Sequence, residues 1–283
     1  MSPVILAQTI GSAALVVSLM FSVGLELEPR QFRALLARRR VVAATLLVNL
    51  AAIPGLAWAL GAALELPAEV VIGVMLCAAA PGGPVSALFT ATAGADLVLT
   101  ASMTILLPTL GVIATPLILS ATVDLPAGAE VPVAPMIGTL VVFQVIPLVT
   151  AMIIRRRRLE LAERLLPYAR GTANAVLLAL VIGLSIVEGK VLLSIDAPTY
   201  LTLLAVLLAS LILGYLAARP ERDMARAGAL VAGCRNISAA IMLAATFFPG
   251  PVVNATILAY GLMSFVIPII LARVWRSSGG LTS

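Results

Sequence analysis

Apolar residues occur along this chain in long runs that short polar segments separate. A helix needs about 20 predominantly apolar residues to cross a bilayer. Runs of this length, or nearly this length, predict an all-α integral membrane protein with nine transmembrane helices. The predicted helices cover approximately residues 3–25, 41–62, 67–92, 97–120, 131–154, 171–189, 199–218, 225–248 and 251–274. Because the connections are short, residues 1–283 are predicted to form a single membrane domain.

Composition agrees with this pattern, since 61% of the residues are hydrophobic and only 11% are charged. A soluble domain of this size needs a surface richer in charge. The formal net charge of +5 would suit a nucleic-acid-binding protein, but the arginines lie in short clusters between apolar runs. That distribution is typical of membrane loops, so no nucleic-acid partner is expected.

The positive charges also predict the orientation. With nine helices, sixteen of the 18 lysines and arginines fall on one side of the membrane. An excess of this kind marks the cytoplasmic face. We therefore predict a multi-pass protein of the inner (plasma) membrane, with its N-terminus outside and its C-terminus inside. The N-terminal run lacks a basic region, so we expect it to stay as the first helix rather than to be cleaved as a signal peptide.

Groups that carry chemistry are scarce. The chain has no histidine, and its two cysteines, Cys77 and Cys234, lie in separate apolar runs, where they are interpreted as small buried apolar residues. All 13 acidic residues can be placed in loops or at helix ends. No metal, cofactor or catalytic group is therefore expected, and Arg235 is the only charge expected deep within a helix.

Two of the predicted helices are interrupted. The third contains the sequence Pro81, Gly82, Gly83, Pro84, and the eighth contains Gly233 directly before Cys-Arg-Asn. Proline lacks an N–H group and glycine weakens a helix, so a break is expected at the first of these places. Glycine could instead serve close helix packing. Packing does not explain both prolines.

A weak internal repeat relates these regions. Residues 92–101 and 248–257 share a glycine and a threonine at an offset of 156, and residues 22–29 and 181–188 match at an offset of 159. The interrupted helices are five positions apart, so the two halves would be inverted in the membrane. Transporters built in this way place their site where the interrupted helices meet.

Arg235 itself admits three interpretations. A mid-helix arginine costs ~2.5–3.5 kcal/mol on insertion scales and normally faces the protein interior. It could hydrogen-bond the free carbonyls of the interrupted third helix, or it could also hold an anionic substrate, because its five fixed donors suit both roles. A side chain that extends to the membrane surface is disfavoured, since apolar residues flank it on both sides.

The ordered motifs resemble those of the bile acid:sodium symporter family. They comprise "MFSVGLELEP" (20–29), "LPAE" (66–69), "PGG" (81–83), "TP" (115–116) and "GCRN" (233–236), where the family has G-M-Q-N. The resemblance implies an inverted repeat of five plus five helices, of which this chain would lack the first. It also implies a panel domain, about 1–28 and 131–190, and a core domain, about 41–120 and 199–276, that contains two crossing broken helices.

The resemblance further implies two sodium sites beside the crossing, and some of their ligands are retained. Ser86 matches the serine of P-G-G-x-x-S-N, Thr100 and Thr104 match hydroxyl ligands of the next helix, Asn49 matches an amide ligand, and Asn236 matches the last asparagine. The hydroxyl groups could equally be ordinary interhelical hydrogen-bonding groups.

Other ligands are replaced. Ala87 stands for an asparagine, Val231 for the acidic ligand that the two sites share, and Arg235 for the glutamine of E-x-G-x-Q-N. Two like unit charges 4 Å apart repel by ~4 kcal/mol at an effective dielectric near 20. We therefore expect Arg235 to replace sodium electrostatically. Gln144 and Asn174, which fall in the panel, could line a substrate cavity.

These observations favour a secondary transporter of an organic anion that works by alternating access without sodium. The resemblance suggests an amphipathic carboxylate as the substrate, and the surrounding lipid is the other expected partner. The alternative is a sodium-coupled symporter of bile-acid-like or other organic anions that uses Ser86, Thr100 and Thr104. No phosphate-binding G-x-x-x-x-G-K-[ST] loop occurs, and no buried carboxylate is expected to carry protons, so exchange or facilitated diffusion is favoured. An intramembrane enzyme is disfavoured, because the sequence has no cluster of catalytic groups within the predicted helices. A sensor that binds a ligand without transporting it is a further alternative.

Overall fold

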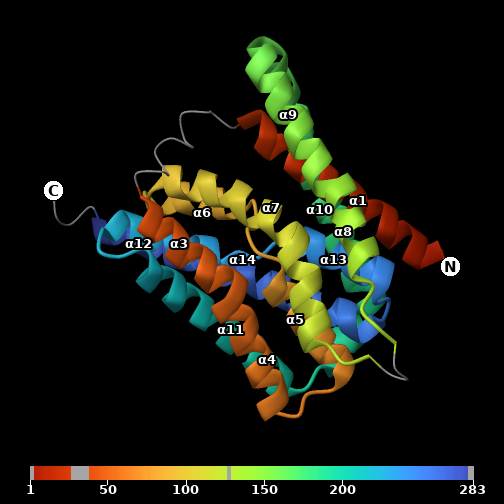
Figure 1. Ribbon diagram of the computed structural model, residues 1–283. Helices are drawn as coiled ribbons and strands as arrows, with labels where there is room; N and C mark the ends of the chain where they lie inside the picture. The colour runs from red at the N-terminus through yellow and green to blue at the C-terminus, as the bar shows by residue number, and fades with distance from the viewer. Residues whose placement is uncertain (1–2, 27–37, 126–128, 280–283) are drawn as a thin grey trace.

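The computed structural model describes residues 3–26, 38–125 and 129–279 (Figure 1). Within these ranges the chain forms helices and no strands, which confirms the predicted all-α membrane fold. Its helices are α1 (Pro3–Glu26), α3 (Arg39–Leu47), η1 (Val48–Ala52), α4 (Ile53–Ala63), α5 (Ala68–Ala79), α6 (Ser86–Ala93), α7 (Leu97–Thr122), α8 (Val133–Leu140), η3 (Val141–Val145), α9 (Ile146–Arg157), α10 (Leu159–Ser194), α11 (Ala197–Ala217), α12 (Arg222–Gly233), α13 (Ile237–Phe247) and α14 (Pro251–Gly279).

By length and composition, eight helical segments within the described residues are suited to cross a membrane. The remaining apolar run, expected as one helix over 67–92, is divided into α5 and α6, and α5 is a shorter apolar helix of 12 residues. The predicted count of nine is therefore not established. It would require α5 and α6 to cross together.

One helix is much longer than the sequence pattern indicates. Helix α10 begins at Leu159 rather than near residue 171 and has 36 residues. The pattern of apolar residues marks only the portion of α10 that is apolar enough to lie within a bilayer. Glu160, Glu163 and Arg164 are good helix formers, so the helix continues beyond the apolar part through the basic segment.

Two transmembrane segments contain a wide π-helical turn directly before a proline. In η1 the Ile53 N–H bonds to the Val48 carbonyl, and Pro54 follows; in η3 the Ile146 N–H bonds to the Val141 carbonyl, and Pro147 follows. Proline removes the N–H that would continue the regular pattern. Such wide turns are frequent at functional sites, and each of these two holds a buried amide side chain.

The helices form two groups on either side of a buried centre (Figure 1). Helix α1 packs against α9 and α10, whereas α11 packs against α3, α4 and α12 on the opposite side. The segment Arg222–Phe247, which contains α12 and α13, has 83% of its most apolar window buried, against 11% for α10. The interrupted helix α12–α13 is therefore central, and α10 is peripheral.

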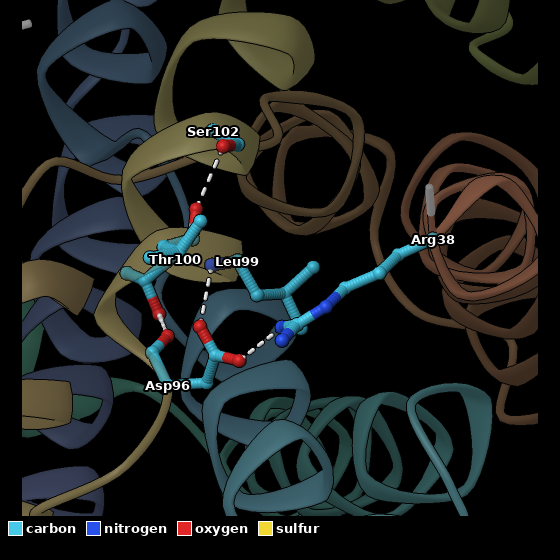
Figure 2. A network of polar contacts seen from close by, with 6 residues as sticks. Arg38, Asp96, Leu99, Thr100 and Ser102 are labelled. Atoms are coloured by element: carbon cyan, nitrogen blue, oxygen red, sulfur yellow. Dashed lines mark hydrogen bonds and ion pairs between the residues drawn. The ribbon is translucent and has the colours of Figure 1, made fainter. Parts of the chain in front are cut away.

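Contacts between connecting segments place the predicted basic loops together. Arg38 forms an ion pair with Asp96, whose carboxylate also accepts a hydrogen bond from the Leu99 N–H at 2.8 Å and so caps α7 (Figure 2). The Asp96 N–H donates to the Asp223 carbonyl at 3.2 Å. These contacts put residues 38, 96 and 223 on one face of the molecule.

A second set of contacts joins the other basic segment to the end of α1. Arg155 donates to the Leu25 carbonyl at 2.7 Å, and Arg170 forms an ion pair with Glu26 at 2.8 Å. Each pair joins two loops that the predicted topology assigns to the same side of the membrane. Which side faces the cytoplasm stays a prediction.

Candidate functional site at the helix crossing

The two interrupted helices meet at their breaks and are joined by backbone hydrogen bonds. The Gly83 N–H donates to the Cys234 carbonyl at 2.9 Å, and the Asn236 N–H donates to the Ala80 carbonyl at 2.9 Å. Helix α5 ends at Ala79 and α6 begins at Ser86, so the break covers the segment that contains both prolines. Each broken helix thus supplies backbone partners that the other has lost.

Glycine is required where the chains approach most closely. A Cβ atom on Gly83 would lie 2.4 Å from the Arg235 carbonyl oxygen, which is closer than any ordinary contact. Gly82 has φ +80°, a conformation that favours glycine, and a Cβ there would lie 2.6 Å from Cδ of Pro108. The two glycines between the prolines therefore serve both the close approach and the turn.

The carbonyls at the end of α5 would be unsatisfied in an isolated broken helix. Three outside groups supply their donors. The Cys77 and Ala78 carbonyls accept from Arg235, the Ala79 carbonyl accepts from Thr115 Oγ1 at 2.5 Å, and the Ala80 carbonyl accepts from the Asn236 N–H. In a low-dielectric interior no water is available to bind these carbonyls. Each of these bonds therefore satisfies an acceptor that would otherwise lack a partner.

Arg235 is surrounded by oxygen atoms. Its side chain is buried, with 3% exposure. Nε donates to the Cys77 carbonyl at 3.3 Å, Nη1 to Asn49 Oδ1 at 2.7 Å, and Nη2 to the carbonyls of Asn49 (3.2 Å) and Ala78. All of these acceptors are neutral. No ion pair among the described residues includes Arg235.

Asn49 is positioned by the wide turn η1. Its amide Nδ2 donates to the Thr45 carbonyl at 2.8 Å, which orients Oδ1 toward Arg235. Both the side chain and the backbone carbonyl of Asn49 therefore bind the guanidinium. The wide turn makes that backbone carbonyl available within a helix.

Asn236 and Gln144 form a second polar contact next to the first. Asn236 Oδ1 accepts from the Ala239 N–H at 3.2 Å and caps α13, while Nδ2 donates to Gln144 Oε1 at 3.1 Å. Gln144 Nε2 in turn donates to the Pro108 carbonyl at 2.7 Å. The contact therefore joins α13, η3 and α7.

A small cavity of about 10 Å³ lies beside this contact. A volume of that order holds about one water molecule. An organic anion does not fit in the conformation described here. The lining residues are Ala80, Pro81, Pro108, Gly111, Thr115, Leu140, Gln144, Asn236, Ala239 and Leu243.

The predicted hydroxyl ligands lie in a separate buried cluster of hydroxyl groups. Ser86 Oγ lies 3.4 Å from Thr104 Oγ1 and donates to the Gly83 carbonyl at 2.8 Å. Thr100 Oγ1 lies 3.0 Å from Thr90 Oγ1 and donates to the Asp96 carbonyl at 3.2 Å. Thr90 is a member that the sequence pattern did not indicate.

The remaining predicted positions lie apart from these groups. Val231 is buried in an apolar cluster with Leu99, Met103 and Leu107, so packing occupies the place where the resemblance implies an acidic ligand. Asn174 is exposed on α10 and does not line the cavity beside Gln144. The structure thus brings Asn49, Gln144, Arg235 and Asn236 to the crossing, but not Asn174.

Two further charged groups, Arg226 and Glu188, are buried by the fold although they lie near helix ends rather than deep within a helix. Arg226 has 6% exposure and lies over the Trp275 ring at 5.7 Å from its centroid, and Glu188 has 8% exposure. Linear position puts both residues near helix ends. Tertiary packing of neighbouring helices covers them, and no pattern in the sequence shows that.

The fold and the crossing define a class of protein, the membrane transporters in which two interrupted helices meet within the helix bundle. Residues 13–195 match the model of the sodium bile acid symporter family. The chain belongs to this family, which is a family of transporters and not of enzymes. The match ends before α12, so the assignment does not depend on Arg235. The comparison with curated proteins gives no match.

Proposed function

We propose that this protein is a secondary transporter that moves an organic carboxylate anion by alternating access and does not couple to sodium. The observation that carries the proposal is the enclosure of the Arg235 guanidinium by neutral oxygen acceptors at the crossing. Carbonyl and amide oxygens also form the coordination shells of hard metal ions. Here those oxygens already bind the guanidinium of Arg235, a cationic group of the protein itself.

Electrostatics supports the loss of sodium binding. A sodium ion at the crossing would be repelled by the guanidinium, and Val231 supplies no compensating carboxylate. The surviving hydroxyl groups of Ser86 and Thr104 contact each other, that of Thr100 contacts Thr90, and all three donate to backbone carbonyls, so their partners are neutral. The alternative of sodium symport would need these neutral groups alone to offset the repulsion.

We infer that the moving parts are the panel (about 1–28 and 131–190) and the core (about 41–120 and 199–276). Gln144 lies on the panel side of the small cavity, and Asn236 and Pro108 lie on the core side. Opening of this contact would enlarge the cavity and expose both amides to a substrate carboxylate. Arg235 braces the crossing from within the core and increases the positive potential at the cavity.

The membrane and orientation proposed for this function are the inner (plasma) membrane, with the N-terminus outside. The contacts of Arg38 with Asp96 and of Arg170 with Glu26 support the arrangement of the basic loops on which that orientation rests. With this orientation the basic face is cytoplasmic.

The proposal is tested by uptake of a panel of organic carboxylates into proteoliposomes that contain only potassium salts. We expect saturable uptake of at least one amphipathic carboxylate, and we expect Asn236→Ala to reduce it more than tenfold while the protein stays folded. Ligand binding without uptake would instead identify a sensor. Uptake that occurs only when sodium is added would support the symporter alternative.

A further inference from the structure

A basic segment connects α9 to α10 and extends along the first turns of α10. Residues 155–170 contain six arginines and two glutamates, which gives the segment a net charge of +4. Helix α9 ends at Arg157 and α10 begins at Leu159, so only Arg158 lies between the two helices. The two helices therefore join at the most basic point of the chain, where four arginines follow one another.

The basic segment is held in place by the end of α1. Arg155 donates to the Leu25 carbonyl at 2.7 Å, and Arg170 forms its ion pair with Glu26. A small apolar cluster also joins the three helices, and its buried members are Leu25 of α1, Ala151 of α9 and Ala162 of α10. The segment therefore has a fixed place, at the same end of the molecule as the end of α1 (Figure 1).

Three of the arginines line an open surface pocket of about 470 Å³. They are Arg157, Arg158 and Arg164, and all three are exposed. Within the described part of the chain, none of the three takes part in a hydrogen bond or an ion pair. Glu160 lines the pocket too, which leaves the lining with a net charge of +2. The pocket therefore presents unpaired guanidinium groups to an anion.

Apolar side chains complete the lining. Leu159 and Leu161 line the pocket with exposures of 52% and 37%. The preceding segment, Val133–Arg157, is long and apolar enough to cross a membrane, and only 22% of its most apolar window is buried. Its exposed side chains, such as Ile153, therefore suit contact with lipid, and the arginines begin two residues later. The pocket thus lies where the hydrocarbon region of a bilayer gives way to the headgroups.

We propose that this pocket binds the headgroup of an anionic phospholipid. Guanidinium groups bind phosphate oxygens through paired N–H donors, and a lining of charge +2 attracts a headgroup that carries one or two phosphates. The exposed leucines contact the upper part of the acyl chains. A water-soluble phosphate would gain from the arginines but not from the leucines, which favours a lipid as the source of the phosphate.

The arrangement of these arginines goes beyond what orientation in the membrane requires. Basic residues in loops set the orientation by their number on each side. Residues that served only this purpose would not need to converge on one pocket. Clusters of four to eight basic residues directly beside a transmembrane helix are typical of binding to anionic lipids. The convergence of three unpaired arginines and two leucines therefore indicates a lipid site.

Lipid bound here would contact the protein outside the helix crossing. The apolar cluster attaches the basic segment to α1 and α9, which belong to the proposed panel. A bound headgroup would hold that group of helices at the membrane surface while the core moves. This consequence rests on the proposed function, whereas the binding itself does not.

Binding is measured by the melting temperature of the purified, delipidated protein in detergent. The protein is titrated with phosphatidylglycerol or with its two-phosphate form, diphosphatidylglycerol. A ligand that binds only the folded protein raises the melting temperature. We expect a saturable rise with at least one of these lipids, on the order of 3 °C at ten times the Kd. Phosphatidylcholine, which has no net charge, and inorganic phosphate at equal ionic strength should give no comparable rise.

The test variant replaces the three pocket arginines together, as Arg157→Gln, Arg158→Gln and Arg164→Gln. Each basic residue near an anionic surface contributes about a fivefold factor in affinity, so this variant should bind the anionic lipid on the order of 100-fold more weakly. If the triple variant does not fold, the single variants Arg158→Gln and Arg164→Gln decide. Each should weaken binding about fivefold.

The matched control removes the same charge from exposed arginines of other segments, as Arg40→Gln, Arg222→Gln and Arg276→Gln. It should bind the lipid like the wild type. Equal affinities in the pocket variant and in this control would overturn the proposal. Equal rises with phosphatidylcholine or with inorganic phosphate would also contradict it, because they would assign binding to the acyl chains alone or to a small anion. None of these measurements requires transport, so they decide the proposal even if the proposed function fails.

Discussion

Arg235 satisfies acceptors from two different helices with a single side chain. Its guanidinium binds Asn49 of η1 and the carbonyls of Cys77 and Ala78 at the end of α5. From the sequence, Arg235 was expected to be buried at a helix break. The free carbonyls of the interrupted third helix were one of its predicted partners. The participation of the Asn49 carbonyl could not be predicted. It depends on the wide turn η1 and on the packing of α11 against η1, α5 and α12, which are far apart in sequence.

The Arg235 and Asn49 side chains form a buried hydrogen bond that can be tested by substitution. Arg235→Gln and Asn49→Ala should each reduce stability by ~1–3 kcal/mol, because each leaves buried partners unsatisfied. In the double variant the losses should not add, and the interaction energy should be at least ~0.5 kcal/mol. Denaturation in detergent measures all four proteins. Strict additivity would mean that the two side chains do not act together.

The second prediction concerns Gly83. Gly83→Ala places a methyl group 2.4 Å from the Arg235 carbonyl oxygen, so the crossing must separate. We expect a loss of ~1–3 kcal/mol, as for other overpacked sites. Gly55→Ala is the matched control, because nothing lies within 4 Å of its Cβ position. Equal melting temperatures for both variants would show that the backbone contact is not tight.

At the scale of elements, the breaks were the most predictable feature. Two prolines around two glycines cannot continue a helix, so the gap between α5 and α6 follows from local chemistry. The start of α10 was missed, because residues 159–170 are polar and the apolar pattern ends at the bilayer. Burial of Glu188 was missed too, since burial arises from the packing of α1 and α14 and not from position along α10.

Helix α7 is preceded by a carboxylate with two roles. Asp96 caps the helix and also pairs with Arg38, and Figure 2 shows one carboxylate in both roles. Asp96→Ala should cost ~0.5–2 kcal/mol through the lost cap. Asp96→Asn keeps a capping oxygen and should cost less than ~1 kcal/mol, because the Arg38 side chain is 37% exposed and exposed ion pairs are weak. Equal losses in the two variants would assign the stability to the ion pair instead.

At the scale of the whole molecule, the family and the all-α fold could be predicted from the sequence, whereas the contact between η3 and the start of α13 could not. The contact depends on Gln144 and Asn236, which are far apart in sequence and meet only after the helices pack. Asn174 illustrates the limit. Like Gln144, it falls in a run that the sequence predicts to be a transmembrane helix, yet it lies exposed on α10.

Movement of the panel can be tested by cross-linking. Leu140 of α8 and Leu243 of α13 both line the small cavity. Cysteines at both positions, joined by a short bifunctional thiol reagent, should lower carboxylate uptake more than tenfold. Each single-cysteine variant treated in the same way is the control, since Cys77 and Cys234 are buried. Undiminished uptake in the cross-linked protein would contradict motion at this contact.

We propose that Arg235 takes the place of the sodium ion that the family resemblance implies at the crossing. This is tested by the melting temperature of the purified wild type in sodium chloride and in potassium chloride at equal ionic strength. A bound ion at one hundred times its dissociation constant would stabilise the protein by ~2.7 kcal/mol, which corresponds to a shift on the order of 5–10 °C. We predict the same melting temperature in both salts. A sodium-specific rise of that size would mean that the protein binds sodium despite Arg235.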